Sequence, residues 1–165
     1  EGKSISLSMD MDPGIPELWM DPDRVRDALT NLMKNSFEAI PLSGSIRVET
    51  RREILPTALK SDFFLEGGDG SSLSFDSYAV VRIIDTGKGI PEEVHDQLFY
   101  PFFTTKQTGS GVGLPLARKI VEGHQGILDF ESVVGRGTTF IVKLPLLTRR
   151  DGAPLTPQAA ETMES

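Results

Sequence analysis

The stretch 85–114 constrains this chain more than any other part of its sequence, because it places five glycines, a leading carboxylate and two lysines within thirty residues. The apolar run 78–84 comes directly before it and predicts a buried strand that ends at Asp85. Glycine leaves backbone N–H groups open to a ligand, and such groups at the start of a helix bind phosphate. A carboxylate at the end of a buried strand can accept a charge-assisted hydrogen bond from an amino group such as adenine N6. The stretch therefore predicts a nucleotide site with its base end at Asp85 and its phosphate end at 109–114.

Length and composition set the outer bounds. The 165 residues can bury one sizeable core, and the hydrophobic fraction of 38% is ordinary for a globular domain. No apolar run is long enough to span a membrane, so we expect no membrane contact by this part of the protein. The net charge of −7 argues against nucleic acid binding and agrees with a cytoplasmic location. The lack of cysteine excludes thiol chemistry and disulfides, and a first residue of Glu1 rather than Met indicates a piece of a longer protein.

Periodicity predicts an alternation of strands and helices along residues 1–147. The insertion 55–77 is rich in Gly, Ser and Asp, and we interpret it as a mobile hairpin, with partner docking as the alternative. The tail 148–165 shows no periodicity and is expected to be disordered. Strands are expected over 4–9, 45–54, 78–85, 127–133 and 138–146, and helices over 21–40, 91–97 and 114–122.

The first of these helices carries the strongest local signals. Asp21 suits the N-cap and Pro22 the first helical position, while Pro41 ends the helix. Its apolar face is expected to consist of Val25, Leu29, Leu32, Ser36, Phe37 and Ile40.

The polar face of the same helix needs a separate explanation. Asn31, Asn35 and Glu38 follow each other at helical spacing and therefore project together. Asparagine is a poor residue for a helix interior. A solvated face is one reading, and an Mg²⁺ site is the other, because carboxamide oxygens suit this cation.

Two histidines invite functional readings that the sequence does not favour. His95 precedes an acid, as a phosphoacceptor would, but a surface histidine on a short helix is the preferred interpretation. His124 stands where the last helix ends, so we expect it to cap that helix rather than to react.

In their order and spacing, these motifs resemble those of the ATP-binding catalytic domain of bacterial sensor histidine kinases, in the GHKL superfamily. The resemblance covers about residues 4–146 and is strongest toward the nitrogen-regulation type. Five segments carry it, similar to the N box, the G1 box, the F box, the G2 box and the last hairpin of the family: 31–39, 85–90, 99–106, 109–114 and 135–140.

The resemblance implies a fold and a set of roles. The fold would be α+β, a two-layer sandwich of the Bergerat ATP-binding type, with a mixed five-stranded sheet and three helices on one face. ATP would lie between the first and last helices under a lid at 98–112. Asn35 would coordinate Mg²⁺ with the help of Asn31, and Asp85 would read the adenine amino group. Residues implied to contact the nucleotide are Asn35, Asp85, Gly87, Gly89, Ile90, Thr105, Lys106, Gly109, Gly111, Val112, Gly113, Leu114 and Thr138.

Within that set, the roles differ. Gly87 and Gly89 would let the backbone approach the base. Gly111, Gly113 and Leu114 would offer amides to the phosphates. Lys106 would approach them from the lid and, with Asn31 and Asn35, would form the catalytic group. Glu38 departs from the family pattern, which often has lysine there, so it is assigned no phosphate contact.

The residue at position 31 separates two possible reactions. ATPases of the superfamily carry a glutamate there, four residues before the Mg²⁺-binding asparagine, and it acts as general base. This chain has Asn31, and a carboxamide cannot take that proton. A neutral imidazole needs no such base, so Asn31 favours phosphorylation of a histidine over hydrolysis.

The histidine to be phosphorylated is expected outside this chain. The family's acceptor lies on a dimeric helical domain, and His95 falls between the G1 and F boxes instead. The predicted partners are therefore the dimerisation and phosphoacceptor domain of the same parent protein and, downstream, a response regulator. A GHKL-type ATPase or switch module is the alternative, and a degenerate, non-catalytic nucleotide-binding module is a third reading. The stimulus, and whether the parent is membrane-anchored, are not encoded in these residues.

Overall fold

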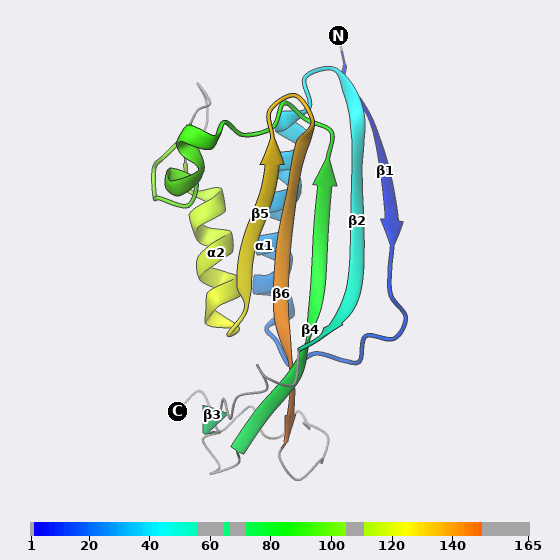
Figure 1. Cartoon of the computed structure of the whole chain (residues 1–165), viewed down its shortest axis with the longest axis vertical. Helices are drawn as coiled ribbons and strands as arrows, with labels where there is room; N and C mark the ends of the chain where they lie inside the picture. The colour runs from blue at the N-terminus through cyan, green and yellow to red at the C-terminus, as the bar shows by residue number, and fades with distance from the viewer. Residues whose placement is uncertain (1, 56–64, 67–71, 105–110, 150–165) are drawn as a thin grey trace.

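The computed structural model describes residues 2–55, 65–66, 72–104 and 111–149. Figure 1 shows a twisted sheet with helices behind it. In chain order the elements are β1 (Ser4–Asp10), α1 (Pro22–Ala39), β2 (Ser43–Ile54), β3 (Leu65–Glu66), β4 (Ser72–Asp85), the 3₁₀ helix η2 (Glu92–Gln97), α2 (Gly113–Gly123), β5 (Ile127–Val133) and β6 (Gly137–Arg149). None of the helices among the described residues is both long and apolar enough to cross a membrane.

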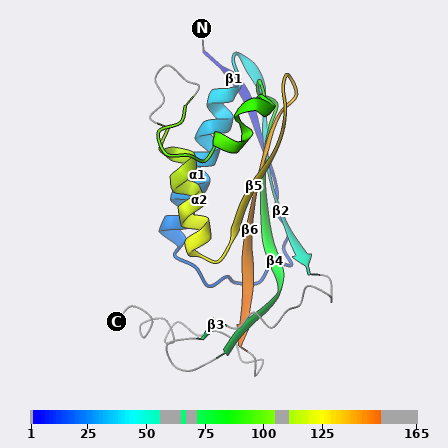
Figure 2. The ribbon, with the colours of Figure 1, turned by 60° about the vertical axis from the view of Figure 1, so that its left-hand side comes forward.

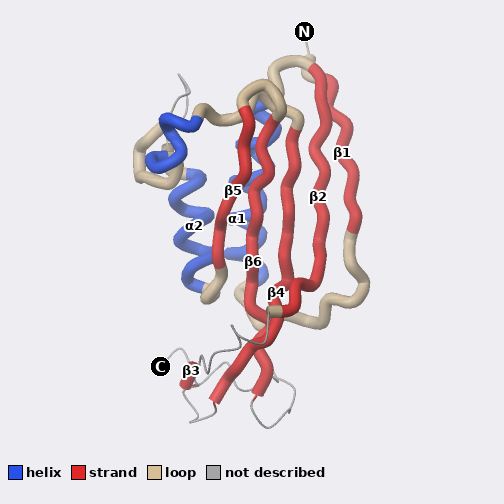
Figure 3. The backbone as a smooth tube through the Cα atoms, viewed as in Figure 1, coloured by secondary structure: helices blue, strands red, loops and turns tan. Residues whose placement is uncertain are grey.

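The sheet is mixed, as the family resemblance implies. Its order is β1-β2-β4-β6-β5, with the two-residue β3 added to β4. β1 runs parallel to β2, and the remaining neighbours are antiparallel. The helices cover one face only, which makes two layers (Figures 2 and 3). The predicted α+β sandwich is thus confirmed, with the second of the three expected helices taking the 3₁₀ form.

α1 starts and ends where its sequence signals stand. Oδ1 of Asp21 accepts hydrogen bonds from the N–H groups of Asp23 and Arg24, both at 3.0 Å, and this satisfies two of the helix's unpaired donors. Ser36 lies in the buried stripe that faces the sheet. Phe37 does not, since it is 48% exposed, and its expected place on the apolar face is wrong. It lies about one third of a turn beyond Ser36, outside the buried stripe.

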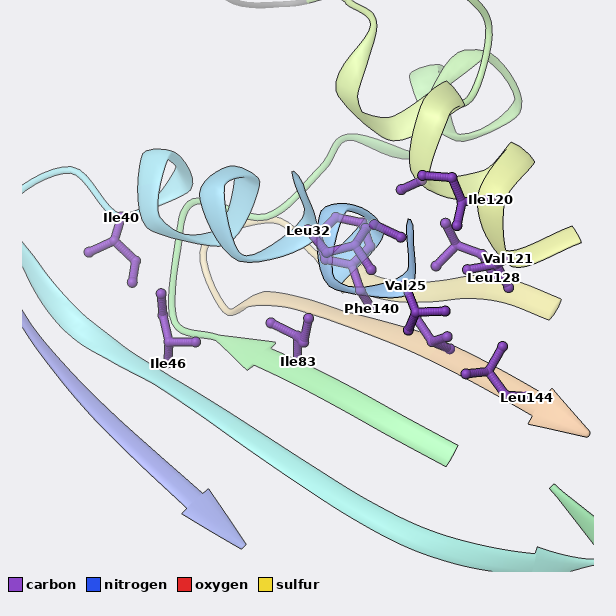
Figure 4. Close-up of a cluster of buried hydrophobic side chains, with 13 residues drawn as sticks. Val25, Leu32, Ile40, Ile46, Ile83, Ile120, Val121, Leu128, Phe140 and Leu144 are labelled. Atoms are coloured by element: carbon purple, nitrogen blue, oxygen red, sulfur yellow. The ribbon is translucent and has the colours of Figure 1, made fainter. Parts of the chain in front are cut away.

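The core lies between this stripe of α1, the inner side of α2 and the facing side chains of the sheet (Figure 4). Alternate residues of β4 and β6 supply the sheet side, as expected for a sheet with one covered face. The buried residues of the core are Val25, Ala28, Leu32, Ile40, Ile46, Ile83, Ala117, Ile120, Val121, Leu128, Phe140, Val142 and Leu144.

Two strands extend beyond their expected ends. β4 begins at Ser72, inside the segment interpreted as an insertion, and β6 continues to Arg149. They pair with each other beyond the part of the sheet that the helices cover, after a bulge between Phe75 and Tyr78. The insertion residues 56–64 and 67–71 and the tail residues 150–165 lie outside the described part of the chain.

Candidate nucleotide-binding site

Asp85 ends β4 on the side of the sheet that the helices cover, and it is only 3% exposed. Its Oδ1 accepts hydrogen bonds from the N–H of Gly87 at 2.8 Å and from the N–H of Thr138, on β6, at 3.2 Å. Its Oδ2 is buried and has no hydrogen-bond partner among the described residues. One oxygen therefore holds the carboxylate in place, and the other is available to a donor from a ligand.

The turn after Asp85 is packed tightly at its two glycines. A Cβ added to Gly87 would lie 2.8 Å from the Cβ of Ala39, at the end of α1. Gly89 has φ +71°, and an added Cβ would lie 2.2 Å from the carbonyl oxygen of Val133. These positions need glycine because the chain passes so close to its neighbours and, at Gly89, because of the positive φ. Their predicted closeness to a base remains a prediction.

A chain of hydroxyl groups fixes the next residue of this turn. Oγ of Ser132, on β5, accepts a hydrogen bond from the N–H of Ile90 at 2.8 Å. The same Oγ lies 2.9 Å from Oγ1 of Thr138, whose N–H is bound to Asp85. Ile90 and Thr138, both predicted site residues, are therefore linked through Ser132, which sequence reasoning missed.

The predicted metal-binding asparagines are on α1, and their side chains lie beside the start of α2. The side-chain Nδ2 of Asn35 donates to the carbonyl of Asn31 at 2.8 Å, which fixes its carboxamide on the helix. A Cβ added to Gly113 would lie 3.2 Å from Oδ1 of Asn31 and 3.8 Å from Nδ2 of Asn35. Two segments far apart in sequence, the N-box-like and G2-box-like motifs, thus meet here.

The start of α2 offers backbone donors. Its N-cap is Val112, which makes no side-chain capping bond, and the first helical residues are Gly113 and Leu114. The first N–H groups of a helix lack intrahelical partners and attract anions. Gly111 precedes this turn with φ +65°, and an added Cβ would lie 2.5 Å from the carbonyl carbon of Phe102. The three remaining predicted contacts, Thr105, Lys106 and Gly109, lie outside the described residues.

His95 is not the simple surface histidine that the sequence favours. It is half-buried, its Nε2 lies 3.0 Å from the carbonyl oxygen of Ile90, and its ring meets the edge of Phe130 at 4.9 Å between centroids. Nothing local predicts these contacts, because Phe130 lies on a strand thirty-five residues away. His95 therefore anchors the chain that follows Ile90 to Phe130 of β5.

The side-chain oxygens and backbone N–H groups of the site fit a nucleotide with bound Mg²⁺. Oδ2 of Asp85, which has no partner within the described part of the chain, suits an amino group, and the backbone donors at Gly113 suit phosphate. No cluster of three or more His, Asp or Glu that could hold a metal occurs among the described residues. A cation here would therefore depend on carboxamide oxygens of Asn35 and Asn31, on the phosphates themselves and on the waters that Mg²⁺ usually keeps.

Comparison with known proteins agrees with this geometry. Residues 20–148 match the family described as histidine kinase-, DNA gyrase B-, and HSP90-like ATPase. The chain belongs to this family. Among its curated members, the sensory histidine kinase/phosphatase NtrB of Vibrio alginolyticus is 34% identical over 147 residues, which are 88% of this chain and 38% of that protein. The sensor histidine kinase ZraS of Escherichia coli (strain K12) is 35% identical over 150 residues, which are 90% of this chain and 28% of that protein.

Solved structures of the same family share the fold. The catalytic domain of the histidine kinase ThkA superposes with a TM-score of 0.64 at 29% identity, covering 86% of this chain and 79% of that one. The resemblance read from the motifs is thus confirmed for the family and for its histidine kinase branch. This member of the histidine kinase-, gyrase- and HSP90-like family spans well under half the length of the curated relatives it matches.

Proposed function

We propose that this chain binds Mg·ATP and transfers the γ-phosphate to a histidine on a separate dimerisation and phosphoacceptor module, as the catalytic half of a two-component sensor kinase. The buried Oδ2 of Asp85, which lacks a partner among the described residues, is the observation that carries the nucleotide part. An amino group such as adenine N6 supplies the hydrogen that this oxygen needs.

The residues of the site divide the work of binding between two ends. Asp85, held by the N–H groups of Gly87 and Thr138, orients the base. The N–H groups at Gly113 and Leu114 hold the phosphates. Asn35 and Asn31 direct oxygens to Mg²⁺, which when bound neutralises phosphate charge. Positioning and charge neutralisation are the main contributions of a protein to phosphoryl transfer.

Asn31 supports kinase chemistry over hydrolysis. Its Oδ1 stands at the start of α2, the phosphate end of the proposed site. A carboxamide at this place cannot remove a proton from water. An imidazole acceptor uses a ring nitrogen that already carries a lone pair, so the new phosphorus–nitrogen bond forms as the bond to the β-phosphate oxygen breaks. The names of NtrB and ZraS as histidine kinases point the same way.

The proposal requires partners beyond this chain. NtrB and ZraS are much longer than the matched region, so their remaining residues can hold the phosphoacceptor domain of each protein. By analogy, the histidine would be supplied by the same parent protein as this chain, and the phosphate would pass on to a response regulator. We place this activity in the cytoplasm, where ATP is available.

A ³¹P NMR time course with Mg·ATP tests the proposal. The chain alone should broaden and shift the ATP lines and release almost no inorganic phosphate over hours. Adding the phosphoacceptor domain of the parent protein should then produce ADP and a phosphohistidine signal in equal amounts. Repeated turnover to ADP and phosphate by the chain alone would establish an ATPase instead. Sharp, unshifted ATP lines would refute the nucleotide site.

A further inference from the structure

β1 is an outer strand of the sheet, and among the described residues only β2 pairs with it (Figures 1 and 3). The N–H of Ser4 donates to the carbonyl of Leu42 at 2.8 Å, where the parallel pairing with β2 begins. Successive residues of a strand turn their backbone groups to opposite sides. The N–H and C=O groups of Ile5, Leu7 and Met9 therefore point to the free edge, where a further strand can pair with them.

The same three residues carry the apolar side chains of β1. Ile5 packs against the core, and this places all three on the face of the sheet that the helices cover. Leu7 and Met9 nevertheless stay exposed, at 54% and 67%. The half-exposed Phe37 of α1 adds to this surface, because Nζ of Lys3, just before β1, lies 4.9 Å from the centre of its ring. The edge thus offers apolar surface together with backbone donors and acceptors.

Residues 4–9 lack the features that normally protect a sheet edge. Charged side chains, proline and bulges prevent unwanted pairing at such edges. This segment contains no charge and no proline, and its register with β2 is unbroken. The outer strand on the other side of the sheet, β5, carries the exposed acids Asp129 and Glu131, which would repel a second copy. Of these two outer strands, β1 is therefore the one suited to pairing.

Charges at the two ends of β1 favour one orientation for such a pairing. Lys3 stands just before the strand, whereas Asp10 is its last residue and Asp12 follows it. If two copies of β1 pair antiparallel, the lysine end of each strand meets the aspartate end of the other. A parallel pairing would instead bring the aspartates of both copies together, and like charges side by side are destabilising. The strand is therefore complementary in charge to an antiparallel copy of itself.

We propose that β1 is a self-association surface, at which two copies of this chain pair antiparallel about a twofold axis at Leu7. Leu7 of each copy then lies opposite Leu7 of the other, and Ile5 lies opposite Met9. These are the residues whose backbone groups point to the free edge, so each opposite pair can exchange two hydrogen bonds. The two sheets continue into one, with the helices of both copies on the same face.

A contact made by one strand is smaller than a standard protein interface, so the chain alone should associate weakly. In the parent protein of the proposed function, the dimerisation module would hold two copies near each other at a millimolar effective concentration. At such a concentration the free edges would pair. The pairing itself does not depend on the proposed function, because none of the residues proposed to contact the nucleotide lies on β1.

Sedimentation equilibrium over micromolar to millimolar concentrations tests the pairing. The average mass of the original chain should rise from 18.1 kDa toward twice that value. Leu7→Lys should stay at the monomer mass, because two lysines would meet at the twofold axis. Its fold should survive, since the side chain is more than half exposed, and circular dichroism checks this. Ile127→Lys adds the same charge at a 48% exposed position of β5 and should associate like the original chain.

A mixing experiment tests the register. Leu7→Glu alone should also stay monomeric, but an equal mixture of Leu7→Glu and Leu7→Lys should associate again, because opposite charges then meet. A mixture that stays monomeric would show that Leu7 does not face its own copy, and the antiparallel pairing would be wrong. An original chain that is monomeric at millimolar concentration would overturn the inference, as would association that Leu7→Lys retains or that Ile127→Lys loses. Failure to bind ATP would refute only the proposed function.

Discussion

The two carboxylate oxygens of Asp85 have different surroundings, and this predicts how the residue responds to substitution. Oδ1 is held by two backbone N–H groups, whereas Oδ2 lacks a partner among the described residues. Asp85→Asn can keep an oxygen in the first position, so the fold should survive. Its amide nitrogen would then take the place of Oδ2 and face the adenine amino group, donor against donor.

We therefore expect Asp85→Asn to weaken ATP binding by about tenfold or more, which corresponds to the loss of a hydrogen bond to a charged group. Isothermal titration calorimetry measures the affinity, and circular dichroism of the ligand-free protein checks the fold. An affinity equal to that of the original chain would remove Asp85 from the base pocket.

Single residues differ in how far the sequence could predict them. The buried position of Asp85 at the end of β4 was predictable, because a lone acid after an apolar run and before glycines is a local signal. Ser36 was predicted only as part of a buried helix face. That its hydroxyl lacks a partner among the described residues depends on how α1 packs on the sheet, which no local pattern contains. The contact of His95 with Phe130 was missed for the same reason.

Asp21 links the start of α1 to the pH dependence of stability. Its carboxylate accepts hydrogen bonds from the N–H groups of Arg24 and Asp23, and these bonds lower its pKa in the folded chain. A lowered pKa means that the ionised cap stabilises the fold above the unfolded pKa, and that this contribution is lost as pH falls through the folded pKa.

Asp21→Asn should reveal how much the ionised carboxylate contributes to stability, because asparagine caps helices well but does not titrate. At neutral pH the original chain should be the more stable of the two, and the difference should shrink as the pH is lowered to about 3, below the ordinary aspartate pKa. Urea unfolding midpoints at several pH values measure the difference. If the difference in unfolding midpoint between the two proteins stayed constant with pH, the charge of Asp21 would contribute nothing to stability.

His124 joins the two long helices at the end of the molecule away from Asn35. Its Nε2 accepts a hydrogen bond from the N–H of Asp21 at 3.0 Å, while Nδ1 donates to the carbonyl of Ile120 at 2.7 Å. The sequence predicted a cap for α2 and missed the link to α1. His124→Ala should cost about 1–2 kcal/mol of unfolding free energy, as expected for two neutral hydrogen bonds.

The same substitution should change ATP affinity by less than about twofold, because the ring makes no contact with the site. Urea titration and calorimetry on one preparation give both numbers. Gln125→Ala, at the exposed neighbour with φ +58°, is the control for a change at the end of α2 that removes neither bond. A stability equal to the original chain would show that the helices need no such link.

Elements with local signals were predicted well, and elements that depend on distant partners were not. Asp21, Pro22 and Pro41 fixed α1 to within about one residue. The strand segment 72–77, by contrast, lies in a Ser-rich stretch that reads as a loop. It is extended because it pairs with the end of β6, with Phe75 opposite Leu147. This pairing joins residues more than seventy positions apart.

The sandwich as a whole has one covered and one open face. On the open face, β2 presents Arg47, Glu49, Arg51 and Glu53 in alternation with its inward residues. Lys143 on β6 forms a salt bridge with Glu53 at 3.1 Å. Val80 stands in register between Arg51 and Lys143 and is only 2% exposed, so the aliphatic stems of such side chains shield it. Charged side chains thus cover at least this part of the open face.

On the helix side, the site joins α1, α2 and the sheet, so its ligand should stabilise the whole molecule. A ligand that binds only the folded state adds about 2.7 kcal/mol at a hundredfold excess over its Kd. ATP with Mg²⁺ should raise the melting temperature more than ATP with a chelator, because in the proposed site Asn35 and Asn31 would hold the cation beside the phosphates.

Asn35→Ala tests this dependence on the metal. The variant should lose the additional rise that Mg²⁺ gives with ATP, while adenosine, which has no phosphates, should stabilise the variant and the original chain equally. Because Nδ2 of Asn35 also bonds the carbonyl of Asn31, each shift must be taken relative to the ligand-free melting temperature of the same protein. If the variant kept the full Mg²⁺ increment, the cation would be held elsewhere and the predicted role of Asn35 would be wrong. If adenosine binding were lost as well, Asn35 would shape the base pocket, and the separation of the site into a base end and a phosphate end would fail.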